Sequence, residues 1–361
     1  MYDLKDSMLV DYVIVGQGIA GTTLAWHLME KGVRVQVLDM EKKHTSSWAA
    51  AGLYNPVTGR KMVKTWMADE LFPYLHTFYR KIEEKCSQKF LHPTPIYRPF
   101  LSLEEQNDWH LRANNKAFAH FVENVATESM FPATVHDPWG GILLKNCGYL
   151  DTVAYLEASR QYFKSQQVYS KASFDQNKLV TGKDYISYGG HHAKALVFCE
   201  GPDVTTNPYF NWLPFSLVKG EILTVKPERV HEVVFNRGIF VLPLGDKSRV
   251  GSTYEHQNLN TLPTEKARTY LAEKFDKLCK FSTRVIEQRA GIRPATRDRK
   301  PFVGQHPEVS PVFIFNGMGT KGVTLAPFFA HQFTHHLLEN QPLEDAVNIE
   351  RFYHLYNSVL T

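Results

Sequence analysis

The stretch DYVIVGQGIAGTTLAWHLMEKGVRVQVLDME, residues 11–41, decides the fold of this chain. Residues 12–15 form a short apolar run with β-branched side chains, which is typical of a strand buried on both faces. The glycine motif GQGIAG follows at residues 16–21 and leads into an apolar helical pattern. A second apolar run, residues 33–38, is closed by Asp39. The stretch therefore predicts a strand, a glycine turn, a helix and a second strand.

Each residue type in the glycine motif has a physical reason. Gly16 allows the sharp turn out of the strand, Gly18 lets a pyrophosphate approach the backbone, and Gly21 lets the helix pack closely on the sheet. The free amides and the positive end of that helix then face the phosphates. Asp39 lies where a carboxylate accepts both ribose hydroxyls, which disfavours the 2′-phosphate of NADP. This context favours dinucleotide binding over a glycine-rich turn of another α/β protein.

The composition is that of an ordinary globular protein of 361 residues, long enough for two or three domains. Lysine and arginine outnumber aspartate and glutamate by 41 to 37 without a basic run, so the charge does not indicate nucleic-acid binding. The cysteines stand singly, without metal-ligand spacing, which indicates a reducing compartment and no metal site. Asp3, Lys5 and Asp6 are unlike a signal peptide, and no apolar run in the sequence reaches membrane-spanning length. We therefore expect a cytoplasmic protein.

Small residues at 46–52 follow this first unit and allow the backbone to approach something flat or phosphorylated. The alternative is a helix start capped by Ser46 or Ser47. A turn rich in cations lies at 57–61, and residues 66–84 have an amphipathic helical pattern.

From residue 90 to 146 the pattern changes to prolines, aromatics and short alternating segments, which indicates a second domain. Residues 193–201 then form another buried strand, which ends in glycine. Further alternating runs predict an antiparallel sheet and lie at 219–225, 238–243 and 249–254. A helix that runs to about residue 278 follows, with Thr264 as its cap.

A second glycine turn, NGMGTKG at 316–322, lies far along the chain from the first. It follows an apolar strand at 312–315 and precedes a helix that we expect to begin near Pro327. The two turns therefore repeat the same local arrangement of strand, glycines and helix N-terminus.

The order of these signals resembles the D-amino-acid-oxidase superfamily of FAD enzymes, which includes glycine oxidase and monomeric sarcosine oxidase. The resemblance spans nearly the whole chain, and the order and spacing of the motifs are more specific than any one of them. Beyond the GxGxxGxxxAxxL start and Asp39, the matching segments are the small residues at 46–52, GYLD at 148–151, the strand ending at Gly201, KGE at 219–221, LPLG…RVGSTYE at 242–255, GIRPATRD at 291–298 and NGMGTKG at 316–322.

The resemblance implies an FAD held between the two glycine turns. The ADP half would lie on the first turn, the ribityl chain and flavin along the small-residue segment, and the pyrimidine edge of the flavin at the second turn. A helix N-terminus there stabilises the anionic reduced flavin. The implied FAD-binding residues are Gly16, Gly18, Ile19, Ala20, Gly21, Asp39, Met40, Ser46, Ser47, Ala49, Ala50, Ala51, Gly52, Leu53, Gly201, Gly317, Gly319, Thr320, Lys321, Gly322 and Val323.

The resemblance also implies roles for two arginines and a lysine. Arg293 falls where glycine oxidase has the arginine that clamps the substrate carboxylate, a role that suits a bidentate guanidinium. Alternatively, Arg293 forms a structural ion pair with Asp298 and does not bind substrate. The family's second carboxylate-binding arginine is replaced here by Thr320 and Lys321, and Lys321 either adds positive charge at the flavin or is a solvated turn lysine. Sarcosine oxidases carry an oxygen-activating lysine near the RVGSTY segment, where Arg249 is the nearest cation of this sequence.

The implied reaction is oxidation of the C–N bond of a primary or secondary amine or amino acid, preferably one that bears a carboxylate. A hydride passes from the α-carbon of the neutral amine to flavin N5, and the imine hydrolyses in water. Tyr254 and Tyr54 are candidates to orient the amine, although a tyrosine in the core is the alternative for each.

Other functions remain open at this point. The RPATRDRKPFVG and GMGTKGVTLAP segments are also similar to the oxidoreductase half of the bifunctional tRNA 5-methylaminomethyl-2-thiouridine biosynthesis enzyme. That half removes a carboxymethyl group from a modified wobble uridine, and Arg60, Lys61 and Lys64 would then serve tRNA unless they are simply solvated. A protein that binds FAD without turnover is another possibility, whereas the second glycine turn disfavours an NAD-dependent dehydrogenase. Three histidines within 331–336 are more typical of surface or core positions than of a metal pair.

We expect an α/β, Rossmann-like FAD-binding domain and an α+β substrate domain with a mainly antiparallel sheet. The substrate would be a small amine or amino acid, and we expect no membrane contact. The FAD-binding domain would be discontinuous, with the boundaries 1–85, 147–215 and 288–361, and the substrate-binding domain would span 86–146 and 216–287.

Overall fold

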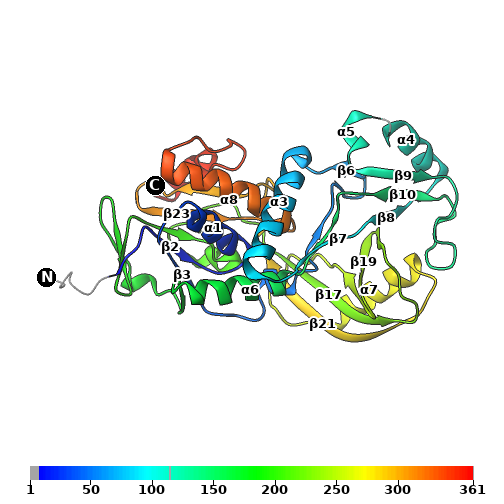
Figure 1. Ribbon diagram of the computed structural model, residues 1–361, viewed down its shortest axis with the longest axis horizontal. Helices are drawn as coiled ribbons and strands as arrows, with labels where there is room; N and C mark the ends of the chain where they lie inside the picture. The colour runs from blue at the N-terminus through cyan, green and yellow to red at the C-terminus, as the bar shows by residue number, and fades with distance from the viewer. Residues whose placement is uncertain (1–7, 114, 361) are drawn as a thin grey trace. The chain divides into compact units, whose positions relative to one another are not determined.

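The computed structural model describes residues 8–113 and 115–360, which divide into two compact units (Figure 1). The described parts of residues 1–48, 153–218 and 292–361 form unit 1, and those of 49–152 and 219–291 form unit 2. Residues 49–85, which we expected in the FAD-binding domain, belong to unit 2, where β4 (Leu53–Tyr54) pairs with β11 (Gly148–Leu150). The roles of the two units in binding FAD and substrate stay predictions. The charged residues before Met8 lie outside the described residues.

Unit 1 is built on a six-stranded sheet with the order β12-β3-β2-β16-β23-β22. Neighbouring strands are parallel except for the antiparallel pair β22–β23. Strand β2 lies in the middle of the sheet, with β3 as its neighbour on one side and β16 as its neighbour on the other. The direction of the strand order therefore reverses at β2, which confirms the Rossmann-like arrangement. The strands span Tyr12–Val15 (β2), Val35–Asp39 (β3), Tyr169–Lys171 (β12), Ala195–Phe198 (β16), Phe302–Gln305 (β22) and Val312–Asn316 (β23).

Helices and a smaller sheet bury the six-stranded sheet. Helices α1 (Ile19–Glu30) and α8 (Gly322–Glu339) lie side by side in Figure 1. Trp26 of α1 packs on Tyr162 of α6, with ring centroids 4.6 Å apart. Val13 and Val15 of β2 instead join a core that includes residues of the smaller sheet. The other elements of unit 1 are α6 (Thr152–Ser165), β1 (Met8–Leu9), β13 (Val180–Thr181), β14 (Ile186–Tyr188), β15 (His191–Ala193), the 3₁₀ turns η2 (Gln176–Lys178), η3 (Gly201–Thr206) and η4 (Ile349–Phe352), and α9 (Tyr353–Leu360).

Unit 2 is built on an eight-stranded, mainly antiparallel sheet with the order β21-β17-β20-β19-β18-β8-β10-β9. Its strands span Ile96–Pro99 (β8), Val122–Ala126 (β9), Gly141–Leu144 (β10), Val218–Pro227 (β17), Val234–Arg237 (β18), Ile239–Leu244 (β19), Lys247–Gly251 (β20) and Thr283–Arg293 (β21). Leu271 and Phe275 of α7 (Glu265–Leu278) pack into its core with Val241 and Val250. The remaining elements of unit 2 are β5 (Val57–Thr58), β6 (Val63–Lys64), α3 (Ala68–Cys86), β7 (Leu91–Pro93), α4 (Leu103–Ala113) and α5 (Lys116–Ala119). Helix α2 (Ser46–Ala49) lies at the boundary, with residues 46–48 in unit 1 and Ala49 in unit 2.

The structure differs from our sequence-based expectations for unit 2 at two places. Strand β20 ends at Gly251, so residues 252–254 lie in the loop that follows and not in the predicted strand. Helices α4 and α5 lie within the region where we expected only short segments. The start of α4 carries a capping box, because the amide of Glu105 donates to Ser102 Oγ at 3.2 Å and the Glu105 carboxylate accepts from the amide of Leu101 at 2.8 Å.

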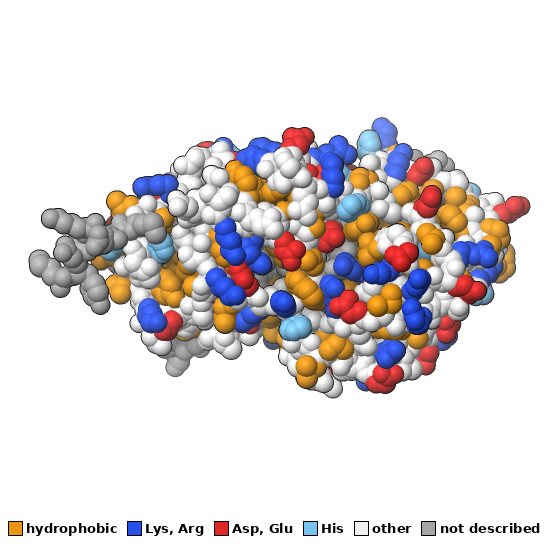
Figure 2. Space-filling view, turned by 60° about the horizontal axis from the view of Figure 1, so that its bottom comes forward, with side chains coloured by type: hydrophobic (Ala, Val, Ile, Leu, Met, Phe, Trp, Pro, Cys, Tyr) orange, Lys and Arg blue, Asp and Glu red, His pale blue; other side chains and the backbone are white. Residues whose placement is uncertain are grey.

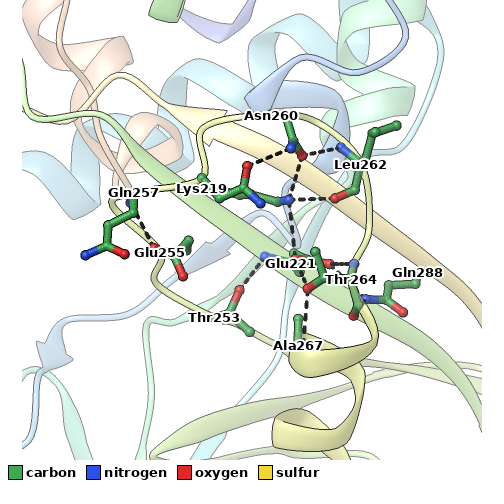
Figure 3. A network of polar contacts seen from close by, with 11 residues as sticks. Lys219, Glu221, Thr253, Glu255, Gln257, Asn260, Leu262, Thr264, Ala267 and Gln288 are labelled. Atoms are coloured by element: carbon green, nitrogen blue, oxygen red, sulfur yellow. Dashed lines mark hydrogen bonds and ion pairs between the residues drawn. The ribbon is translucent and has the colours of Figure 1, made fainter.

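A buried ion pair holds the loop between β20 and α7 (Figure 3). The side chains of Lys219 and Glu221, on β17, are almost fully buried, with Nζ 3.6 Å from Oε1. Lys219 Nζ donates to Asn260 Oδ1 at 2.9 Å and to the carbonyl oxygen of Leu262 at 2.6 Å. The Glu221 carboxylate accepts the amide and the hydroxyl of Thr264, both at 2.8 Å, and Thr264 caps α7 as predicted. The pair therefore fastens both the loop and the start of the helix.

We predict that Lys219→Met destabilises the protein strongly. The substitution leaves the Glu221 carboxylate buried without its counter-charge, which costs about 3–5 kcal/mol. Urea denaturation followed by far-UV circular dichroism measures the loss. The double variant Lys219→Met, Glu221→Met removes both charges and should lose clearly less. Equal losses in the single and double variants would contradict this role of the pair.

Candidate functional site

Three turns of unit 1 meet at the carboxyl ends of parallel strands. Val15 of β2 is in register with Phe198 of β16, which is in register with Ile314 of β23, so the turns after these strands share one edge of the sheet. The side-chain amide of Asn316 donates to the carbonyl oxygen of Gly201 at 2.9 Å. A Cβ at Gly16 would lie 2.6 Å from the carbonyl oxygen of Cys199. Ligands of open α/β sheets bind at such an edge.

The first turn brings backbone amides to this edge. Gly16 has φ +99°, and a Cβ at Gly21 would lie 1.9 Å from the Gly16 carbonyl oxygen, so both positions require glycine. Gly18 caps α1 without a side chain, as close approach of a phosphate requires. The amide of Ile19 donates to Ser47 Oγ at 3.1 Å. The positive end of α1 thus faces the carboxyl edge of the sheet.

Asp39 lies beside this turn at the end of β3. Its Oδ2 accepts the amide of Gln17 at 2.8 Å, and its Oδ1 accepts the amide of Glu41 at 2.6 Å. Each carboxylate oxygen has a further lone pair, so the side chain is oriented and still able to accept ribose hydroxyls. Met40, also expected to contact FAD, is exposed.

The second turn lies against the N-terminus of the first helix. Gly317 and Gly319 have φ +78° and +55°. Helix α8 begins at Gly322, so the predicted start near Pro327 is wrong, because the amides of residues 324 and 325 already bond to the Lys321 carbonyl oxygen. A Cβ at Gly322 would lie 2.9 Å from the Ile19 side chain, so the two helix N-termini adjoin.

The segment that carries Arg293 borders this second turn. The amide of Gly319 donates to the carbonyl oxygen of Pro294 at 3.1 Å, and Arg293 is the last residue of β21. Asp298, the structural partner considered for Arg293, lies 3.1 Å from Arg351 Nε. Arg293 and Lys321 are both half-buried. Burial lowers the pKa of the Lys321 ammonium, and repulsion from Arg299 adds to this effect.

Glu200 is a feature of this edge that the sequence did not single out. It follows β16, and its Cα lies 3.4 Å from the position of a Cβ on Gly16. Burial raises the pKa of its carboxyl to about 7, and the charge of Asp203 adds to the shift. Asn207 Nδ2 donates to its Oε2 at 2.7 Å and opposes the shift. The sequence did contain a signal for this residue, because Glu200 directly precedes Gly201, the glycine at which we expected the buried strand to end.

Glu200 makes the stability of the protein depend on pH. Between its ordinary pKa of 4.5 and about 7, the folded state binds more protons at Glu200 than the unfolded state does. Its contribution to stability therefore falls as pH rises through this window, by about 3 kcal/mol in total, and is constant above it. We predict that Glu200→Gln removes this slope and is the more stable protein at pH 8, measured by urea denaturation from pH 5 to 8. Parallel pH curves for the two proteins would contradict the assignment.

The small-residue segment does begin with a short helix, α2, but its capping residue is not the one that we expected. The amide of Trp48 donates to Thr45 Oγ1 at 3.2 Å, so neither Ser46 nor Ser47 has that role. In unit 2, a Cβ at Gly52 would lie 1.9 Å from the carbonyl oxygen of Leu150, so the segment runs close to another backbone, as small residues allow.

Unit 2 also holds Arg249 and Tyr254. Arg249 Nη1 donates to the carbonyl oxygen of Ala50 at 3.3 Å, which joins the arginine to the small-residue segment. Tyr254 is 64% exposed, whereas Tyr54 is fully buried, as the core alternative for Tyr54 requires. Of the predicted site, unit 1 therefore brings together Gly16, Gly18, Ile19, Ala20, Gly21, Asp39, Ser47, Gly201, Arg293, Gly317, Gly319, Lys321 and Gly322, and unit 2 brings together Ala50 and Arg249.

A family model described as "FAD dependent oxidoreductase" (DAO) matches residues 11–336. The chain belongs to this family. The DAO oxidoreductase is 24% identical to a glycine oxidase of Pseudomonas aeruginosa over 346 residues, which cover 87% of the chain and 91% of the relative. It is 21% identical to the tRNA 5-methylaminomethyl-2-thiouridine biosynthesis bifunctional protein MnmC of Leptospira interrogans, covering 94% of the chain and 59% of that longer protein. The crystal structure of glycine oxidase from Geobacillus kaustophilus has the same fold, with a TM-score of 0.74, 18% identity, and coverage of 95% and 98% of the two chains.

The family fixes the class of chemistry. The protein is an FAD-dependent oxidoreductase, and FAD is its cofactor. At the carboxyl edge of the sheet of unit 1, a Cβ on Gly16 or Gly21 would collide with the backbone. A backbone without side chains at this place suits the close approach of the pyrophosphate of FAD. No helix of the described residues combines the length and the apolarity needed to cross a membrane. Within residues 8–113 and 115–360, no group of His, Cys, Asp and Glu is arranged to hold a metal ion, and His335 bonds to Glu339.

Proposed function

We propose that this oxidoreductase oxidises the C–N bond of a primary or secondary amine that bears a carboxylate. The observation that carries the proposal is the contact between Gly319 and Pro294 at 3.1 Å, since it joins the segment of Arg293 to the second glycine turn. The similarity to a glycine oxidase supports the same substrate class. When bound, FAD supplies the acceptor for the hydride of the substrate α-carbon.

The residues proposed to bind FAD are those that the family resemblance implies. From unit 1, the proposed set is Gly16, Gly18, Ile19, Ala20, Gly21, Asp39, Met40, Ser46, Ser47, Gly201, Gly317, Gly319, Thr320, Lys321, Gly322 and Val323. From unit 2, it is Ala49, Ala50, Ala51, Gly52 and Leu53.

Each proposed catalytic side chain has a chemical task. Arg293 binds the substrate carboxylate, because a guanidinium is always charged and donates two parallel hydrogen bonds. Lys321 and the N-terminus of α8 stabilise negative charge. Tyr254 orients the amine, and Arg249 adds positive charge from β20. Water hydrolyses the resulting imine.

An anaerobic absorption spectrum tests this function. We expect a flavin spectrum that bleaches when one of glycine, sarcosine, proline or a D-amino acid is added, because reduced flavin loses its visible bands. A flavin that no amine bleaches would favour a protein that binds FAD without turnover. Absence of flavin bands even after addition of FAD would contradict the proposed site.

We predict that Asp39→Ala weakens FAD binding about 10- to 100-fold, since it removes an acceptor of charge-assisted hydrogen bonds. Titration of the apoprotein with FAD, followed by flavin fluorescence, measures the dissociation constant. Asp11→Ala is the matched control, because Asp11 pairs with Arg34 and Lys194 at the opposite end of β2. Equal affinities of the wild type and Asp39→Ala would contradict the ribose contact.

We predict that Arg293→Met lowers kcat/KM for a carboxylate-bearing amine about 100-fold, the loss expected for a bidentate charged contact. An amine without a carboxylate should be oxidised by the variant and the wild type at similar rates. Arg297→Met, which changes an exposed neighbour, is the control and should behave like the wild type. A uniform loss on both kinds of amine would instead indicate a structural role.

Removal of the carboxymethyl group from modified tRNA is the second candidate, and the similarity to MnmC over 94% of the chain favours it. Arg60 and Lys61 are exposed, whereas Lys64 already pairs with Asp69. On the face shown in Figure 2, basic and acidic side chains are interspersed and form no single basic field. Bleaching by carboxymethylaminomethyl-modified tRNA alone, and by no small amine, would establish this candidate over the first.

A further inference from the structure

Gln17 carries the side chain by which the first glycine turn of unit 1 is held. It stands between Gly16 and Gly18, and its side chain is buried. Its Nε2 donates to the carbonyl oxygen of Leu156 at 2.9 Å, and its Oε1 accepts from Arg160 Nε at 2.7 Å. A buried carboxamide requires partners of this kind. Both polar atoms of the Gln17 side chain are therefore bonded to helix α6.

One turn of α6 grips this carboxamide. Leu156 and Arg160 are four residues apart, so they lie on the same face of the helix. The bond from the guanidinium is charge-assisted and short, which makes it the stronger of the two. Helix α6 is itself fixed to α1, because Trp26 Nε1 donates to Ser159 Oγ at 2.9 Å. The helix therefore offers the glycine turn a fixed support.

The backbone of Gln17 orients the carboxylate at the end of β3. The amide of Gln17 donates to Asp39 Oδ2 at 2.8 Å. The other oxygen, Oδ1, accepts the amide of Glu41, which follows closely in the sequence and moves with Asp39. The bond from Gln17 thus connects Asp39 to the glycine turn. A shift of the Gln17 backbone would move the donor that orients Asp39.

Arg160 also lies within electrostatic range of the end of β3. Burial raises the pKa of the Tyr169 hydroxyl, the charge of Asp39 adds to this shift, and the charge of Arg160 opposes it. Arg160 and Asp39 therefore act on the same hydroxyl. The cation has two ways to influence a ligand of Asp39, through Gln17 or by its charge alone. The bond to Gln17 favours the first, since it holds the guanidinium on the turn.

We propose that Arg160 and Gln17 are positioning residues for the adenosine ribose of FAD. Arg160 fixes the side chain of Gln17, the amide of Gln17 orients Asp39, and the Asp39 carboxylate accepts the ribose hydroxyls. The inference rests on the proposed function in one respect, that FAD binds at the first glycine turn. It extends the ribose site from β3 to α6, and it does not depend on which amine is oxidised.

The 2′-hydroxyl of the ribose separates this role from general stability. ADP and 2′-deoxy-ADP differ by that hydroxyl, and calorimetric titration of the apoprotein measures both dissociation constants. The wild type should bind ADP about 10-fold more tightly, as a hydrogen bond to a charged acceptor predicts. Arg160→Met and Gln17→Met should each reduce this preference to about 3-fold or less, because Asp39 is no longer held in place. A merely structural loss would weaken both nucleotides equally and would overturn the proposal.

Two further variants separate positioning from packing and from charge. Ser159→Ala removes a buried hydrogen bond between α6 and α1 without touching Gln17, so it should keep the full preference for ADP. In the Asp39→Ala background, Arg160→Met should change ADP affinity less than about 2-fold, because the residue through which it acts is gone. Gln17→Met leaves the guanidinium in the protein. A preference that survives in Gln17→Met but not in Arg160→Met would indicate a direct effect of charge and would overturn the relay.

The nucleotide titrations separate this inference from the proposed function. If the wild type prefers ADP and no amine bleaches its flavin, the proposed reaction fails while the positioning role stands. If an amine is oxidised and Arg160→Met keeps the full preference for ADP, the positioning role fails while the proposed function stands. A wild type that does not distinguish the two nucleotides would also overturn the role of Arg160. Far-UV circular dichroism verifies that each variant is folded.

Discussion

The approach of helix α1 to the strand before it is the constraint on which the rest of unit 1 depends. A Cβ at residue 21 would lie 1.9 Å from the carbonyl oxygen of Gly16, so the helix can reach this position only with glycine there. That approach aims the amides of α1 at the edge of the sheet. It also sets the place of Ile19, against which Gly322 of α8 packs, so one close contact fixes two helix N-termini. Backbone packing, more than side-chain contacts, thus shapes the edge of the sheet at which we proposed that FAD binds.

The buried charges of the protein fall into two kinds. Lys219 and Glu221 satisfy each other and five further hydrogen bonds bind them to their surroundings, which offsets the cost of removing both from water. Glu200 and Arg249 are less completely compensated, and each lies beside a segment for which we proposed contact with FAD. Perturbed and under-coordinated charges are typical of functional sites because binding, and not folding, is what completes them.

Local signals allowed the first glycine turn, the cap of α7 and the Rossmann-like class to be predicted from sequence. Each depends on residues within a few positions, such as Gly16 with Gly21 or Thr264 with Ala267. The start of α8 was misjudged because a proline usually marks the first turn of a helix, whereas Pro327 lies inside this one. Helix α4 was missed although Ser102 and Glu105 form a capping box. The raised pKa of Glu200 and the approach of Pro294 to Gly319 arise from contacts across the fold, which no local pattern encodes.

The order of the strands has a consequence for the biosynthesis of this enzyme. Strand β16 pairs with β2 on one side and with β23 on the other, and more than a hundred residues separate Phe198 from Val312. At a synthesis rate of about 5–20 residues per second, that edge of β16 waits roughly 6–20 seconds for its partner. An unpaired apolar strand edge is a template for association with other chains. One edge of β16 is therefore open to association with other chains while strands β17–β21 of unit 2 are being made.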